Sequence, residues 1–500
     1  MEPARATEQG VDHGGSGDDG GRLTGSVVVV ALVSAISGLL YGYDTGIISG
    51  ALLQITDDFG VGDGMQQVIA ASILLGAVVG ALTCSRLSET RGRRTTLVLV
   101  AVVFVVGALW AALAPNPLML VLGRLVLGFA VGGATQTAPI YVAELAPTKF
   151  RGRLVLFFQV AIGVGIVIST VVGAAEVVDW RVAVGAASVP AAIMLVLMLR
   201  LPESPRWLAA RGDDDGARAA LERVRSQGSD VGPELDEVRE AVRAEEQETT
   251  RGWRGLREGW VRPALVVGCG LAVFTQLSGI EMIIYYSPTI LTDNGFSDSA
   301  ALRVSVALGV TYLVTQLIGL AIIDKVGRRR LTLLTLPGAA LALLVLGTFF
   351  VTGNDGPEMV PWIVATLVVF MAFTAGGIQL MGWLTGSEIY PLATRAAGAA
   401  AQSASLWGTN LLITLTLLTI INTIGTGQTF WLYAAFNVAA FVFLYRKMPE
   451  LTGRSLEQIE GHLRSGRFTP ADLAHPVAGT PRGDAAARGD AGTGGGRSDH

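Results

Sequence analysis

The chain has 500 residues, of which 51% are hydrophobic and only 16% are charged, and its formal net charge is −4. Soluble domains carry about 25% charged residues, so this composition excludes a soluble enzyme or a disordered scaffold, and the lack of a basic excess argues against a nucleic-acid partner. Apolar runs of about 18 or more residues recur, the length needed to cross a hydrocarbon core of about 30 Å. The sequence therefore predicts an all-α protein that spans the lipid bilayer many times.

The predicted elements begin with a Gly- and Asp-rich cytoplasmic tail over residues 1–25, which is expected to be disordered. Residues 26–201 hold six apolar spans, residues 202–262 form a charged linker with helical stretches, and residues 263–447 hold six further spans. Residues 448–500 form a second tail, of low complexity from about 466. The twelve spans are approximately 27–50, 66–86, 95–114, 118–143, 153–175, 181–201, 263–291, 300–323, 331–352, 361–386, 396–421 and 429–446.

The charges between the spans orient the chain. Basic residues cluster in the connections 86–94, 144–153 and 324–330, whereas the alternate connections are acidic or neutral. Positive charges are retained on the cytoplasmic side of a membrane. We therefore expect a multi-pass protein of the plasma or inner membrane, with both termini and the linker in the cytoplasm.

The two halves of the chain share motifs. Glu144-Leu-Ala-Pro recurs as Glu388-Ile-Tyr-Pro, Gly92-Arg-Arg94 recurs as Gly327-Arg-Arg329, and Pro202-Glu203 recurs as Pro449-Glu450, all at similar offsets. This indicates a duplication of six spans plus six. Duplicated bundles are typical of carriers that work by alternating access, with a binding site near the midplane between the repeats.

Several motifs occur together and in order along the chain: Gly38 to Gly50 with Asp44, Tyr141-Val-Ala-Glu-Leu-Ala-Pro147, Pro202-Glu-Ser-Pro-Arg-Trp207, Gln276-Leu-Ser-Gly-Ile280, Asp324-Lys-Val-Gly-Arg-Arg329 and Gly453-Arg-Ser455. From about Val30 to Glu460 the chain resembles the sugar porter family of the major facilitator superfamily. The resemblance implies two six-helix bundles that rock about a central site to transport monosaccharides or polyols. No cofactor, catalytic residue or metal site is expected from the residues themselves, since the histidines all lie outside the apolar segments.

Two charges are predicted to lie inside the membrane. Asp44 is about 26 Å along the first span and Arg124 about 9 Å into the fourth, which enters from the other side, so their depths match. A buried pair of this kind either couples protons to transport or is a static link between two helices. The resemblance favours coupling, because proton-coupled sugar porters carry an aspartate at this position and many facilitative members carry a neutral residue. Gly38, Gly42, Gly46 and Gly50 form a close-packing stripe from which Asp44 is expected to point away.

A sugar site needs polar groups for hydroxyls and aromatic faces for apolar ring surfaces. The resemblance places six such side chains in the central cavity, with Tyr41 and Tyr286 as weaker candidates: Gln159, Gln276, Glu281, Tyr285, Trp383 and Trp407. The sequence departs from the family at Thr275, where a glutamine is common, at Glu281, where asparagine is usual, and at the apolar Leu406. Glu281 is therefore a binder of two neighbouring hydroxyls, a second proton site, or a structural partner between helices.

A third group of charges lies at the cytoplasmic ends of the spans. The resemblance implies that these residues form a salt-bridge latch between the bundles in the outward-open state, although they also fit simple determinants of topology: Glu89, Arg93, Arg94, Glu144, Arg151, Asp324, Arg328, Arg329, Glu388 and Arg395. The first-half latch is the less typical one, because Glu89 departs from the family pattern.

The leading hypothesis is a proton symporter that imports a hexose, pentose or inositol and functions as a monomer. The alternatives are a facilitative sugar uniporter, a drug–proton antiporter with the same fold, and a non-transporting sugar sensor. A membrane enzyme is disfavoured because the sequence shows no nucleophile–base pair or metal cluster.

Overall fold

The computed structural model describes residues 25–147, 151–175, 178–225, 229–247, 252–353 and 356–474. The tail predicted over residues 1–25, apart from Gly25, and the low-complexity part from residue 475 onward lie outside the described residues. Within the described part, twelve segments are long and apolar enough to cross a membrane, as the sequence predicts. Large apolar side chains such as Leu334 and Trp362 remain exposed along these helices, where lipid would cover them.

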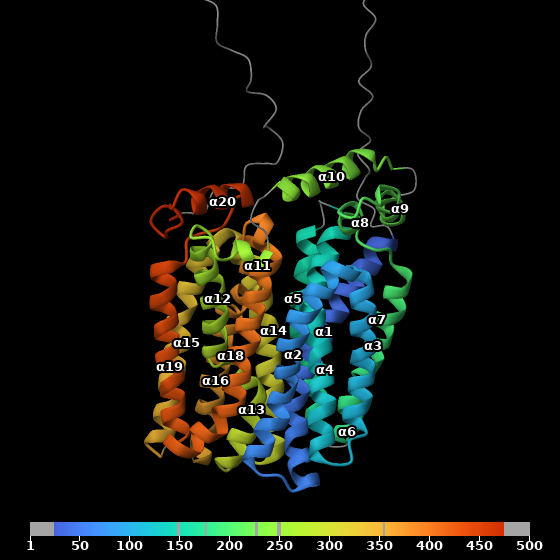
Figure 1. The fold of residues 1–500 in the computed structure, drawn as a ribbon. Coiled ribbons are helices and arrows are strands. Elements are labelled where there is room, and N and C mark those ends of the chain that lie inside the picture. The colour runs from blue at the N-terminus through green and yellow to red at the C-terminus, as the bar shows by residue number, and fades with distance from the viewer. Residues whose placement is uncertain are drawn as a thin grey trace, which may run out of the picture.

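The spans form two bundles that lie side by side (Figure 1). The N-terminal bundle is made of α1 (Gly25–Phe59), α2 (Asp63–Arg91), α3 (Arg93–Ala112), α4 (Pro117–Leu145), α5 (Arg151–Ala174), and a sixth span divided into α6 (Trp180–Gly185) and α7 (Ser188–Arg200). The C-terminal bundle is made of α12 (Arg262–Leu277), α13 (Ile280–Asp293), α14 (Asp298–Val326), α15 (Arg328–Val351), α16 (Val360–Ala375), α17 (Ile378–Glu388), α18 (Arg395–Ile424) and α19 (Thr426–Lys447), with short 3-10 turns at Pro357–Met359 and Leu392–Thr394.

Two spans of the C-terminal bundle are broken in the middle, a feature that the apolar pattern of the sequence does not predict. The span predicted over 263–291 divides into α12 and α13 at Gly279, whose φ of 96° suits glycine. The Asn437 side chain donates to the freed carbonyl of Ser278 at 2.8 Å. The span predicted over 361–386 divides into α16 and α17 at Gly376 and Gly377, where a Cβ on Gly377 would collide with the Thr335 hydroxyl. Breaks of this kind in transporters expose backbone and polar side chains to a central site.

The glycine stripe on α1 packs against α5, as the sequence predicts for a close-packing stripe. A Cβ on Gly42 would collide with the main chain of Ile162, and one on Gly50 would press on Gly173. The absence of side chains on this face brings the two backbones into contact. Asp44 lies on another face of α1 and is free to reach a different helix.

In the described part of the chain, the α-helices outside the spans lie at one end of the bundles, which we name the linker end (Figure 1). They are α8 (Pro205–Ala209), α9 (Asp214–Val224), α10 (Gly232–Gln247), α11 (Gly252–Gly255) and the C-terminal α20 (Leu456–Arg464). Apolar residues of α9 and α10, including Leu221 and Leu235, form a small core of their own. The linker thus contains a folded helical unit.

Candidate transport site

A buried ion pair joins α1 and α4. Arg124 Nη2 lies 3.9 Å from Asp44 Oδ2, and the two side chains are only 1% and 6% exposed. The contact predicted from matching depths is therefore present. The distance exceeds that of a hydrogen bond, and Arg124 Nη2 has no hydrogen-bond partner among the described residues. Arg124 is held instead through Nε, which donates to the carbonyl of Ile69 at 2.9 Å.

Tyrosines of the opposite bundle lie beside this pair. Tyr285 on α13 is within electrostatic range of both Asp44 and Arg124, and Tyr286 is within range of Arg124. Tyr286 also donates its hydroxyl to the carbonyl of Thr414 on α18 at 3.1 Å. A change in the charge of Asp44 in one bundle therefore changes the electrostatic potential at Tyr285 of α13 in the other bundle.

Several buried polar side chains of the two bundles have no hydrogen-bond partner among the described residues. Gln276, at the end of α12, is completely buried, and neither its amide oxygen nor its nitrogen has a hydrogen-bond partner in the part of the chain that the structure describes. Both amide atoms of Gln159 on α5 and the indole nitrogens of Trp383 and Trp407 are also unpartnered within the described ranges. Leaving such groups unsatisfied costs about 1–3 kcal/mol each. A ligand that both donates and accepts hydrogen bonds would remove this cost.

Aromatic rings from both bundles meet at the same place. Tyr41 on α1 contacts Trp407 edge-on with ring centroids 5.2 Å apart, and contacts Trp383 at 6.0 Å. Trp383 and Trp407 are 6.1 Å apart, and Phe158 adds a contact to Trp383 at 6.4 Å. The expected tryptophans thus gather with Tyr41, which the sequence ranks as a weaker candidate. Aromatic faces of this kind suit the apolar faces of a sugar ring.

Glu281 lies at the helix break, in the first turn of α13, and is 1% exposed. Its Oε2 has no hydrogen-bond partner among the described residues. The phenols of Tyr41, Tyr285 and Tyr312 lie within electrostatic range of this carboxyl. Glu281 therefore connects α13 to the aromatic group around Tyr41.

Three further polar residues belong to this region and were not predicted. Gln316 on α14 is fully buried, neither of its amide atoms has a hydrogen-bond partner among the residues described, and its Oε1 lies against Gly163 of α5. Asn410 on α18 and Gln379 on α17 are also buried, with one unpartnered atom each. An amide inside an apolar span is a sequence signal for all three, but it does not reveal which face of the helix the side chain occupies.

Polar contacts join the two bundles on both sides of the central residues. Away from the linker end, Asn422 of α18 donates to Asp63 of α2 at 2.7 Å, and Gln67 donates to Thr419 at 3.2 Å. Nearer the linker end, the Ser403 hydroxyl donates to Gln136 Oε1 at 3.1 Å. These contacts enclose the central polar groups between the bundles.

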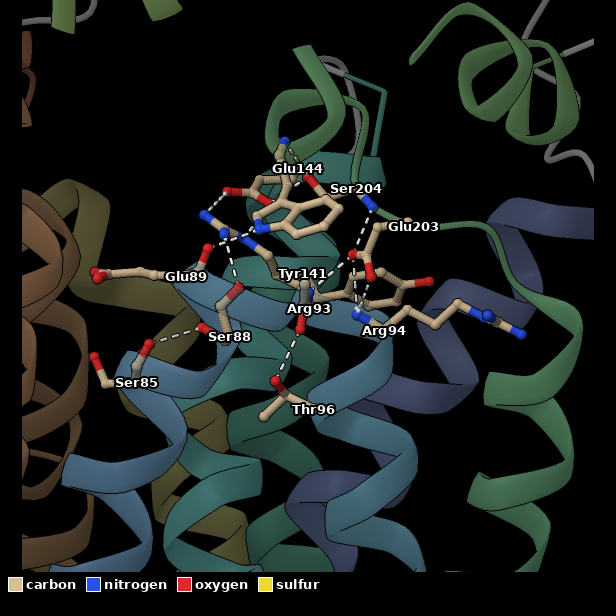
Figure 2. A network of polar contacts seen from close by, with 12 residues as sticks. Ser85, Ser88, Glu89, Arg93, Arg94, Thr96, Tyr141, Glu144, Glu203 and Ser204 are labelled. Atoms are coloured by element: carbon tan, nitrogen blue, oxygen red, sulfur yellow. Dashed lines mark hydrogen bonds and ion pairs between the residues drawn. The ribbon is translucent and has the colours of Figure 1, made fainter. Parts of the chain in front are cut away.

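The charges at the linker end of the N-terminal bundle form one network (Figure 2). Arg93 makes a two-point contact with Glu144, with Nε and Nη2 donating at 3.0 and 3.2 Å. Glu203 accepts from the first two backbone amides of α3, those of Arg93 at 2.8 Å and Arg94 at 3.0 Å. Ser204 donates its hydroxyl to Glu144 and completes the link. A carboxylate at these amides is stabilised by the partial positive charge of the helix N-terminus.

The C-terminal bundle repeats this network. Arg328 contacts Glu388 through two hydrogen bonds, at 3.0 and 3.2 Å, and donates to Asp324 at 2.7 Å. Glu450 accepts from the backbone amides of Arg328 and Arg329 at the start of α15. Burial raises the pKa of the Glu388 carboxyl, although the Arg328 guanidinium opposes that shift. The duplication seen in the sequence is therefore a duplication of helix caps and ion pairs.

These contacts differ in arrangement from the predicted latch, because each of these ion pairs joins helices of the same bundle. Arg94 donates to the carbonyl of Met198, and Arg329 donates to that of Tyr445, again within one bundle. The carbonyl of Glu89 accepts from Trp207 of the linker, and Arg395 Nε donates to the carbonyl of Tyr390. The side chain of Arg151 lies outside the described residues. A latch between the bundles stays a prediction about another conformation.

Two bundles of six spans, with broken helices and unpartnered polar groups between them, define a secondary transporter. A family model described as "Sugar (and other) transporter" matches residues 30–463. The chain is 35% identical to the galactose-proton symporter of Escherichia coli (strain K12) over 88% of this chain and 94% of that protein. It is 34% identical to the major myo-inositol transporter IolT of Bacillus subtilis (strain 168) over 87% of this chain and 94% of that protein.

The fold is also similar to a solved structure. The partially occluded inward-open form of the xylose transporter XylE from E. coli superposes with a TM-score of 0.74 at 27% identity, covering 86% of this chain and 99% of that one. The chain therefore belongs to the sugar transporter family of the major facilitator superfamily.

Proposed function

We propose that this protein imports a monosaccharide or polyol together with protons across the plasma or inner membrane. The observation that carries the proposal is the buried Asp44–Arg124 pair, which is close enough to attract but lacks a direct hydrogen bond. Relatives named as a galactose-proton symporter and a proton:xylose symporter support it. The linker end faces the cytoplasm in this proposal, in keeping with the basic connections at that end.

Asp44 is the proton-coupling group in this mechanism, and Arg124 is its partner. Protonation of Asp44 removes the negative charge that faces the guanidinium, while Arg124 stays tied to the carbonyl of Ile69. The guanidinium then interacts more strongly with Tyr285 and Tyr286 of α13. Movement of α13 against the N-terminal bundle is the step by which proton uptake favours closure around the substrate.

The substrate occupies the region between the unpartnered amides and the aromatic rings. Gln159, Gln276 and Glu281 offer donors and acceptors for hydroxyl groups, and Tyr285 lines the same region. Trp383 and Trp407 offer ring faces and their indole N–H groups. In another state of the cycle, the charged groups at the linker end hold the bundles together as the latch.

Uptake into proteoliposomes tests the proposal. Radiolabelled glucose, xylose, galactose and myo-inositol are supplied with and without an acidic exterior. We expect accumulation above equilibrium of at least one of them, only when the gradient is present. Equilibration that ignores the gradient would identify a facilitative uniporter, in which the Asp44–Arg124 pair is a static link. Failure of all four to enter would contradict the substrate class.

A further inference from the structure

We infer that the preferred substrate carries a positive charge, as an amino sugar or aminocyclitol does, and that Glu281 is the residue that selects it. The inference rests on the proposed function, since it names the substrate class of the same central site. The acidic side chains of Asp44 and Glu281 are both buried. Asp44 has Arg124 as a partner, so that pair is neutral as a whole.

Glu281 has no such partner among the described residues. Its carboxyl is 1% exposed, its Oε2 is unpartnered, and in the described part of the chain no salt bridge reaches it. An isolated carboxylate withdrawn from water is among the most costly groups to bury. Such a carboxyl is either protonated or compensated by a positive charge that the described residues do not supply, and an ammonium group on a substrate that enters this region would compensate it.

Glu281 is the second residue of α13, which begins at Ile280, and lies in the first turn of that helix. The partial positive charge of a helix N-terminus stabilises an adjacent carboxylate. The phenols of Tyr41, Tyr285 and Tyr312 lie near enough to act electrostatically on the same group.

The aromatic residues nearby suit the same ligand. Tyr41 is within electrostatic range of Glu281 and contacts both Trp383 and Trp407 through ring edges. Carboxylates and aromatic faces together are a common environment for ammonium groups, because a ring face attracts a cation as well. The amides of Gln159 and Gln276 remain for the hydroxyls. A hydroxylated ring with one ammonium group satisfies all of these groups at once.

The test compares D-glucosamine with two uncharged ligands, D-glucose and N-acetyl-D-glucosamine. Ligand-induced thermal shifts of the purified transporter give half-saturating concentrations, and proteoliposome uptake of labelled glucosamine and glucose gives transport. For the wild-type protein we expect glucosamine to half-saturate at a concentration about 10- to 100-fold lower than either uncharged ligand, the factor typical of a hydrogen bond between charged groups.

Variants of Glu281 assign the selectivity to this carboxylate. Glu281→Gln keeps the size of the side chain but removes its charge, and should abolish the preference for the amine, so that glucosamine and glucose half-saturate at similar concentrations. Glu281→Asp keeps the charge and should retain most of the preference. Glu358→Gln removes an exposed carboxylate near the connection between α15 and α16, and should change nothing. This control excludes an effect of surface charge.

The outcomes separate this inference from the proposed function. Gradient-driven accumulation of glucose without any preference for glucosamine in the wild type would overturn the inference and leave sugar symport intact. A preference that persists in Glu281→Gln would also overturn it. Failure of both charged and uncharged sugars to bind or move would overturn both. The wild-type measurement needs no variant, so poor folding of a variant does not remove the test.

Discussion

Replacing the two capping glutamates by glutamine tests the duplicated architecture of the linker end. Glu203 caps α3 and Glu450 caps α15, and each accepts from the first two amides of its helix. Glutamine preserves the shape of the side chain but removes the charge and turns one acceptor into a donor. In each variant an N–H group of the new amide then faces backbone N–H groups.

The magnitude follows from the number of contacts and from burial. Loss of a cap costs about 1 kcal/mol and loss of the charge at the helix N-terminus up to about 1 kcal/mol more, so Glu203→Gln should cost roughly 2 kcal/mol. Glu450 is fully buried and also accepts from the Thr452 hydroxyl at 2.7 Å and from the amide of Arg330. Because the site is buried, water cannot replace the acceptor that one of these additional donors loses, so Glu450→Gln should lower the free energy of unfolding by roughly 3 kcal/mol.

Thermal unfolding of the purified protein in detergent measures both effects. For a unit of about 150–250 residues, 1 kcal/mol lowers Tm by about 2–4 °C, so we expect decreases of roughly 6 °C for Glu203→Gln and 9 °C for Glu450→Gln. The exposed Glu222→Gln in the linker is the matched control and should leave Tm unchanged. Decreases below about 1 °C in both variants, or a larger effect for Glu203 than for Glu450, would refute this reasoning about capping and burial.

Three further predictions concern the bundles and the ion pair. Asp44→Asn should abolish accumulation against a gradient while sparing exchange of labelled for unlabelled sugar, and full accumulation by this variant would contradict the coupling role. Gly42→Val should destabilise the protein by about 1–3 kcal/mol, because the new side chain would collide with the backbone of α5. The control is Gly408→Ala on α18, where the added methyl group would point into open space and should leave Tm almost unchanged. In the double variant Asp63→Cys with Asn422→Cys, a disulfide would replace the native contact of 2.7 Å between these two side chains. Uptake should then stop until a reductant is added. Uptake that continues in the oxidised protein would show that the end of the bundles away from the linker does not need to open.

Features that depend on local pattern were predictable from the sequence. The length of the apolar runs predicted the spans, and the matching depths of Asp44 and Arg124 predicted their contact. The spacing of four residues between Gly38, Gly42, Gly46 and Gly50 placed them on one helical face, and that face does pack tightly. Each of these properties is set within a single helix or by simple counting from the membrane edge.

Features that depend on distant partners were not predictable. The repeat of Pro-Glu was visible, but the capping role of Glu203 arises from contact with a helix that begins more than a hundred positions earlier in the chain. The break at Gly279 depends on a left-handed backbone angle and on support from Asn437, and the apolar pattern around it is also compatible with a continuous helix. Gln316 required knowledge of the face that α14 turns toward α5.

The linker-end segments divide cleanly between the two bundles. Arg225 of the linker donates to the carbonyl of Leu145, and Arg211 donates to that of Thr90, so the first part of the linker is fastened to the N-terminal bundle. Beyond residue 252 the chain is fastened to the other bundle, where Leu256 packs with Ala397 and Arg464 of α20 lies over the ring of Trp260. Each bundle is therefore covered at the linker end by its own extramembrane segments. Two separately translated fragments, divided between Gln247 and Gly252, are consequently expected to retain every one of these contacts and to recombine into a working carrier.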